Sequence, residues 1–296
     1  MEAQEMQSEQ AFDNSLILET IKNLPPLPAT VIELKKYIDT SGANLEIPKV
    51  ADIISKDPLL VGKLLQLVNS PFYGLSRQVS TIPQVISLLG VTNVKNIILA
   101  DSVKSNFSID VSPYGIDTPK FLKSCSQEVD FISSWLTQED KILANMLIPC
   151  VMLLRLGIIL LSSILIKSKH DQEFLEENKA NNYNNIHQIE EKYCGIDSLS
   201  FLGFLFDYWK FDETLIQSIA HINNPHSAPD EVKKNAYALA IVNSLFVPFN
   251  SSSSFNSQKA VALINEAKTH NINFDIDNFL NKLPDEIKAI LEHTEE

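Results

Sequence analysis

One charged side chain, Arg155, stands in the middle of an apolar run that extends over residues 146–166. An unpaired charge inside an apolar helix is costly, so the guanidinium requires water, a carboxylate or an anion. Glu128, Asp130 and Glu190 lie in other expected helices and are the candidate partners. The alternative is an anion pocket around Arg155. We expect the structural ion pair.

The histidines are the residues most suited to metal binding or acid–base catalysis, but they are scattered. His221 stands near the expected end of a helix, where an imidazole usually caps or packs because the helix dipole favours it. A single imidazole binds a metal poorly, so we do not expect a metal role for His221. The other five stand in polar segments and form no group with ligand spacing: His170, His187, His226, His270 and His293.

The three cysteines, Cys125, Cys150 and Cys194, are widely separated and include no CxxC pair. This pattern argues against a disulfide framework and a zinc knuckle, and it fits a reduced, cytoplasmic compartment. We interpret the cysteines as small buried hydrophobic residues.

Other active-site signatures are absent from the sequence. It contains no P-loop, GxGxxG, GxSxG or HExxH motif. The pairs Glu176–Glu177 and Glu190–Glu191 stand on polar helices, where adjacent carboxylates are typical of a solvated face.

The net charge of −13 opposes a general attraction to nucleic-acid phosphates, so no nucleic-acid partner is expected. Residues 1–12 are polar and acidic, unlike a signal peptide. The run over residues 146–166 is long enough to span a membrane. However, it contains Arg155, Pro149 and Gly157, which favour a helix buried in a large helical domain over membrane insertion.

Helix start and stop signals recur along the chain. Asp57–Pro58 predicts a helix start, Thr81–Ile82–Pro83 predicts another that Gly90 ends, and Asn93 is expected to cap a helix beginning at Val94. The apolar residues recur at intervals of three and four, and no period-two strand is evident. Only 8 glycines are present. The sequence therefore predicts an all-α chain.

We expect four parts along the chain, of which the two larger follow from the family resemblance described below. Residues 1–13 are expected to be a flexible tail, 14–115 an N-terminal helical subdomain, 116–248 a helical core, and 249–296 a C-terminal loop and helices that pack on the core. Within them, 250–254 reads as a loop. Residues 24–28 are predicted to be an extended, proline-rich segment. Such a segment can be a ligand for an aromatic groove. We expect instead that it is a rigid segment at the start of the domain whose leucines pack on the chain's own core.

Four stretches in one order resemble the HDOD family, a divergent, non-catalytic branch of the HD phosphohydrolase superfamily found in bacterial signalling proteins. They are Leu24–Ala29, Val50–Leu60, Leu67–Gly74 and Ile82–Gly90. The resemblance covers roughly residues 15–225. It implies an all-α fold in which a small N-terminal helical subdomain packs against an HD-like helical core.

The resemblance also implies where a metal site would lie. A working HD phosphohydrolase holds divalent metals with a histidine, an adjacent His-Asp pair and a distant aspartate, and the metal activates a water. Matched to that pattern, this chain lacks nearly all ligands, because leucine and guanidinium cannot ligate a metal. The pattern's positions fall here on Ser124, Leu154, Arg155, Ser198, His221 and Asn243. No metal and no cofactor are therefore expected.

The resemblance and the lost ligands predict a non-catalytic, cytoplasmic signalling or regulatory domain that acts through contacts with a protein partner, possibly a second copy. Two alternatives stay open. One is a metal-dependent phosphohydrolase with altered ligands. The other is a nucleotide-sensing module that binds an anion near Arg155 and His221 without turnover.

Overall fold

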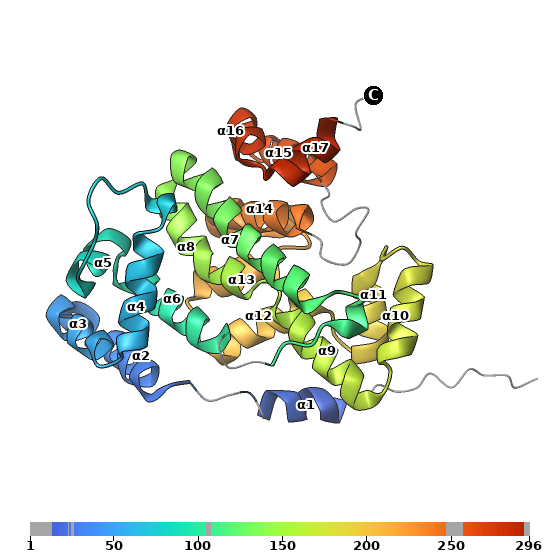
Figure 1. The fold of residues 1–296 in the computed structure, drawn as a ribbon, viewed down its shortest axis with the longest axis horizontal. Coiled ribbons are helices and arrows are strands. Elements are labelled where there is room, and N and C mark those ends of the chain that lie inside the picture. The colour runs from blue at the N-terminus through green and yellow to red at the C-terminus, as the bar shows by residue number, and fades with distance from the viewer. Residues whose placement is uncertain (1–13, 23, 25–26, 105–107, 247–256, 293–296) are drawn as a thin grey trace, which may run out of the picture.

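Every regular element in the described part of the chain is a helix, which confirms the predicted all-α fold. The structure is a computed structural model and describes residues 14–22, 24, 27–104, 108–246 and 257–292. The predicted tail, 1–13, and the predicted loop, 250–254, lie outside the described residues. Figure 1 shows the helices in chain order from blue to red.

Aspartate side chains and prolines begin many of these helices. Asp57 accepts hydrogen bonds from the N–H groups of Leu59 and Leu60, with Pro58 as the first helical residue. A capping box formed by Thr81 and Gln84 begins another helix. Such caps satisfy the N–H groups that lack a partner within the helix.

The N-terminal helices form one group, at the left of Figure 1. Val50, Ile54, Leu64 and Val85 are buried between them. The helices are α2 (Ala29–Ser41), α3 (Ile47–Ser55), α4 (Pro58–Val68), α5 (Ile82–Leu89) and α6 (Val91–Lys104), with the 3-10 turns η1 (Gly42–Asn44) and η2 (Pro71–Tyr73).

Two details of this group differ from the sequence-based expectation. α6 begins at Val91, directly after Gly90 (φ 82°), so Asn93 lies inside the helix and donates to the carbonyl of Leu89 rather than capping. α1 (Asn14–Lys22) contacts a core helix, α9 (Leu156–Ser168), outside the N-terminal group. The chain then passes to α2 through the proline-rich segment, whose Leu24 and Leu27 pack on the chain's own core as expected.

The core is built around α8 (Lys141–Leu153) and α9. Among the described residues, one stretch, Lys141–Ser168, is long and apolar enough to cross a membrane. The pair α5 and α6 would be a second candidate only if two helices with a bend of 109° between them counted as one span. Within Lys141–Ser168, 83% of the most apolar window is buried inside the fold. Core helices meet the same criteria of length and composition, and this burial agrees with the expected core helix.

The remaining core helices surround α8 and α9. α7 packs along α8, α12 packs on α9, and α13 and α14 complete the layer. Their bounds are α7 (Thr118–Glu139), α12 (Ser198–Tyr208), α13 (Glu213–Ala220) and α14 (Asp230–Leu245), with the turn η4 (Pro225–Ser227). At one end, α10 (Asp171–Ala180) and α11 (Ile186–Cys194) pack against α9, and η3 (Ser112–Tyr114) contacts α9 and α10.

The C-terminal helices pack on the core through aromatic side chains. Phe279 lies 5.7 Å from Phe131 and 5.4 Å from Trp135, measured between ring centroids. Phe274 lies 5.2 Å from Trp135. Such pairs add about 0.5–1.5 kcal/mol beyond the area they bury. The helices are α15 (Ser257–Thr269), α16 (Ile276–Lys282) and α17 (Asp285–Glu292).

A buried lysine joins the N-terminal group to the core. Lys95 on α6 has a side chain only 8% exposed, and its Nζ lies 3.0 Å from Asp212 and 3.5 Å from Asp39 on α2. Asn96 also donates to Asp212, at 2.6 Å. Asp212 precedes α13, but these contacts occupy its carboxylate, so it makes no side-chain cap there.

Candidate functional site

Arg155 lies in the turn between α8 and α9, where its own backbone angles, φ −95° and ψ 6°, depart from helical geometry. Its Nε donates to Glu128 of α7 at 2.7 Å, and its Nη1 donates to the side-chain oxygen of Asn243 on α14 at 2.7 Å. Its Nη2 donates to the carbonyls of Asn243 and Phe246. One guanidinium thus joins three parts of the core.

These contacts confirm the expected structural ion pair and identify its partner. The side chains of Arg155 and Glu128 are only 7% and 0% exposed. The other two candidates are wrong: Asp130 is exposed, and Glu190 is buried in a separate network. Charge-assisted hydrogen bonds of this kind are the strong ones in a low-dielectric interior.

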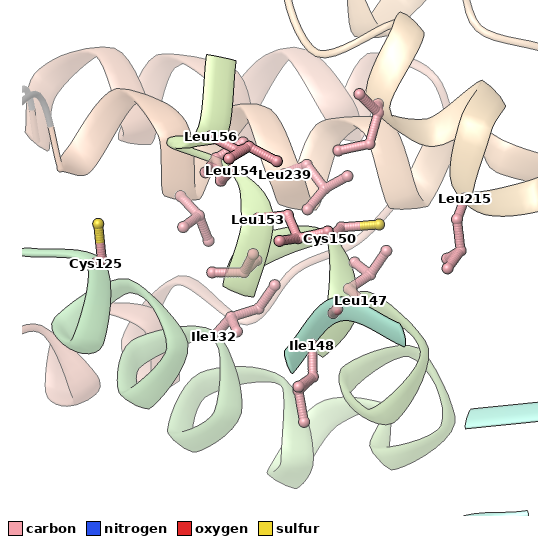
Figure 2. Close-up of a cluster of buried hydrophobic side chains, with 14 of the residues drawn as sticks. Cys125, Ile132, Leu147, Ile148, Cys150, Leu153, Leu154, Leu156, Leu215 and Leu239 are labelled. Atoms are coloured by element: carbon pink, nitrogen blue, oxygen red, sulfur yellow. The ribbon is translucent and has the colours of Figure 1, made fainter. Parts of the chain in front are cut away.

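Leu154 fills the neighbouring position with hydrocarbon. It is 2% exposed, and Figure 2 shows it in a cluster of carbon and sulfur side chains that includes Leu153, Leu156 and Leu239. The adjoining cavity, lined in part by Arg155 and Cys125, measures about 20 Å³. A single water needs about 10–15 Å³ measured this way, so a phosphate group does not fit without rearrangement.

Gly157 brings two helix starts into contact. A Cβ atom added there would lie 1.9 Å from the carbonyl oxygen of Ser198, so only glycine permits this approach. Ser198 begins α12, and both its N–H and its Oγ donate to Glu190, at 2.9 and 3.0 Å.

The other residues that the resemblance matches to metal-ligand positions do not form a ligand set. His221 lies just after α13, and its Nδ1 bonds the carbonyl of Gln217 in its own helix at 2.8 Å, as the capping interpretation predicts. Ser124 is partly exposed on α7, one turn before Glu128. Asn243 contacts Arg155, as described above. A divalent metal therefore does not fit these residues, because His221 is the one strong ligand type among them.

A second polar cluster was missed by sequence reasoning. His187, Glu190 and Asp197 bring three potential metal-ligand atoms within 4.8 Å of one another. His187 Nδ1 lies 3.3 Å from Glu190 Oε2 and 3.7 Å from Asp197 Oδ1. The expectations that His187 joins no ligand-spaced group, and that Glu190 belongs to a solvated face, are wrong. Glu190 is fully buried. The signal available in the sequence was the three-residue spacing of His187 and Glu190, because residues three apart are neighbours on the surface of a helix.

Hydrogen bonds occupy the carboxylates of this cluster. Tyr114 donates to Glu190 Oε1 at 2.8 Å, and Ser198 occupies Oε2. Asp197 caps α12 by accepting from the N–H groups of Leu199 and Ser200. A divalent ion fits the ligand types and their spacing, but binding it would require some of these bonds to lengthen or break.

The pKa values in the cluster follow its charges. Burial and the negative charge of Glu190 raise the pKa of Tyr114 well above its usual value. For His187, burial lowers the pKa, but the hydrogen bond and charge of Glu190, aided by Asp197, outweigh burial and raise it. The cluster therefore favours a protonated His187 beside two buried carboxylates.

The cysteines are confirmed as buried and free. Burial raises the pKa of the Cys150 and Cys194 thiols, which opposes thiolate chemistry at both.

Comparison with known proteins places this geometry in a family. The family model of the HDOD domain matches residues 24–225. The chain is similar to a virulence factor of known crystal structure from Campylobacter jejuni subsp. jejuni, with 52% identity, coverage of 93% of this chain and 96% of that one, and a TM-score of 0.61.

Two further matches are more distant. A protein of Shewanella amazonensis SB2B, provisionally named a phosphohydrolase, has 21% identity, coverage of 90% and 91%, and a TM-score of 0.61, which shows the fold. An uncharacterized protein of Treponema pallidum (strain Nichols) is 23% identical over 233 residues, or 77% of this chain. This chain spans 43% of that relative's length. Because the family model covers most of the sequence, the chain belongs to the HDOD domain family.

Proposed function

We propose that this protein is a non-catalytic, cytoplasmic regulatory domain that acts by binding a protein partner. One observation carries the proposal: the position of the His-Asp metal pair holds a buried leucine, Leu154, and a guanidinium bound to Glu128, Asn243 and Phe246. A guanidinium offers no lone pair. Leu154 and Arg155 offer no metal ligand, which supports a role that does not depend on a metal-activated water.

An exposed aromatic pair supports a role in protein contacts. Phe204 and Tyr208 stand one turn apart on α12, with 43% and 47% exposure, and their rings stack with centroids 6.3 Å apart. Aromatic residues are enriched in the buried centres of protein interfaces. The similar protein from Campylobacter jejuni is named a virulence factor, and 52% identity over nearly the whole chain supports a shared role.

The absence of catalysis is tested on the purified full-length protein. Metal content is measured by mass spectrometry, and hydrolysis of phosphate mono- and diesters is assayed with added Mn²⁺, Fe²⁺, Ni²⁺ or Zn²⁺. We expect substoichiometric metal and no turnover above buffer. A tightly held metal together with metal-dependent hydrolysis would refute the proposal.

The partner is sought by affinity capture from the native cell with a matched pair of variants. Phe204→Ser with Tyr208→Ser removes the aromatic pair, whereas Ile142→Ser removes an apolar side chain that is 81% exposed elsewhere. We expect the first variant to lose a partner that the wild type and Ile142→Ser both retain. Equal recovery from all three would place the interaction elsewhere on the surface.

A second candidate function is a metal-dependent phosphohydrolase with altered ligands, and the cluster of His187, Glu190 and Asp197 is the observation that favours it. The test is metal binding by His187→Gln, with His226→Gln as the control. Stoichiometric metal in the wild type and the control, lost in His187→Gln together with hydrolysis, would establish this alternative. The nucleotide-sensing alternative has no such support, because the cavity beside Arg155 measures only about 20 Å³.

A further inference from the structure

A second and much larger cavity, of about 300 Å³, opens between α4, α6 and α8. It lies where the N-terminal helices meet the core, and boundaries of this kind are frequent sites of ligand binding. Its volume is at the lower end of the ~300–1,000 Å³ typical of ligand pockets. Six hydrophobic side chains form most of its wall: Leu60, Leu64, Leu67, Ile97, Ile98 and Met152.

Two opposite charges line the same pocket. Lys63 Nζ on α4 lies 2.7 Å from Asp101 Oδ2 on α6, and the two side chains are 48% and 25% exposed. An ion pair between exposed side chains is weak, so the charged groups of a ligand can replace it. Gln66 and Ser70 add polar groups to the lining.

We propose that this pocket binds a free apolar α-amino acid such as leucine or methionine. The ligand carboxylate pairs with Lys63, its ammonium group pairs with Asp101, and its side chain packs on the apolar wall. A zwitterion replaces both partners of this ion pair at once, whereas a simple carboxylate or amine replaces only one of them. At about 10–15 Å³ for each water-sized group, as for the cavity beside Arg155, the pocket of about 300 Å³ has ample room for leucine or methionine.

The pocket also adjoins the helix turn that carries the buried ion pair. Met152 lines both this pocket and the small cavity beside Arg155. A bound side chain would therefore contact the last turn of α8, three residues before Arg155. This inference goes beyond the proposed function, and its test does not depend on whether the protein is catalytic.

Calorimetric titration of the full-length protein tests the proposal. We expect saturable binding of L-leucine and L-methionine, and at least about tenfold weaker binding of isocaproate, isoamylamine and glycine, which lack the ammonium group, the carboxylate and the apolar side chain respectively. Absence of leucine binding would overturn the proposal. Equal binding of isocaproate or isoamylamine would overturn the assignment of a zwitterionic ligand.

Variants then locate the binding site. Lys63→Met is expected to weaken leucine binding about tenfold or more, and Leu67→Trp to abolish it by filling the pocket. Lys56→Met is the matched control, because the Lys56 side chain has a similar exposure to that of Lys63 (54% and 48%) and pairs with Glu33 at 2.6 Å in the same helical group. Leucine binding that survives both Lys63→Met and Leu67→Trp would overturn the assignment to this pocket.

Discussion

The ion pair between Arg155 and Glu128 makes a quantitative prediction about stability. Replacing Arg155 by methionine leaves Glu128, which is fully buried, without its cation. Removing one partner of a buried pair typically costs about 3–5 kcal/mol, a large share of a typical stability of about 5–15 kcal/mol. We therefore expect Arg155→Met, and likewise Glu128→Leu, to lower the free energy of unfolding by about 3–5 kcal/mol.

The double variant separates the ion pair from the other contacts of the guanidinium. With Arg155→Met and Glu128→Leu together, neither charge of this pair remains, and the remaining cost is the loss of donors to Asn243 and Phe246, about 1–3 kcal/mol. The double variant should therefore be more stable than either single variant. Lys123→Met is the control on the same helix, because the ion pair of Lys123 with Glu286 is exposed, at 62% and 57%, and worth about 0–1 kcal/mol.

Urea unfolding followed by far-ultraviolet circular dichroism measures these differences. A second arm repeats Arg155→Met at pH 5 and pH 8. Burial penalises the charged form of a carboxyl group that has lost its guanidinium partner, so the loss of stability should be smaller at pH 5. The reasoning is refuted if Arg155→Met costs no more than Lys123→Met, or if the cost of the double variant equals the sum of the two single costs.

Three further predictions concern single residues. The pKa of His187 is raised in the folded protein. Its pairing therefore stabilises the fold fully below the pKa of an unfolded histidine, about 6.5, and this stabilisation is lost as the pH rises through the pKa of folded His187. We expect His187→Gln to lower the urea midpoint more at pH 5.5 than at pH 9. Gly157→Ala places a Cβ atom 1.9 Å from a carbonyl oxygen and should prevent native folding. Gly62→Ala, inside α4, meets no atom within 4 Å. Because glycine destabilises a helix interior relative to alanine, Gly62→Ala should raise the free energy of unfolding by about 0.5–1 kcal/mol in the same assay. Asp57→Ala removes the cap of α4 and should cost about 1 kcal/mol, whereas Asp57→Asn should retain most of the stability.

Local sequence signals predicted the helices well because their causes are local. Asp57 and Asp197 cap helices through bonds to N–H groups two and three residues away. Gly90 ends α5 because its φ of 82° is one that glycine adopts easily. The error at Asn93 has a local cause too, since α6 resumes directly after Gly90 and needs no separate cap.

Features that depend on tertiary packing were harder to predict. Glu190 stands on a helix that reads as polar, yet Tyr114, 76 residues earlier in the chain, and the start of α12 enclose it. The contact of α1 with α9 likewise leaves no periodic signal in either segment. By contrast, the burial of Arg155 in an apolar run did predict a carboxylate partner, because the cost of an unpaired buried charge leaves few alternatives.

The geometry around Arg155 shows how a fixed cation holds several core helices together. In an HD phosphohydrolase, ligands from several helices converge on a cation, and that cation also holds those helices together. Here a guanidinium makes such a link: it joins Glu128, one turn after Ser124, to Asn243, and the family resemblance matches Ser124 and Asn243 to the first and last ligand positions. A guanidinium stays charged at every physiological pH and cannot be removed by chelation. The guanidinium of Arg155 thus forms a permanently charged link from the α8–α9 turn to α7 and α14.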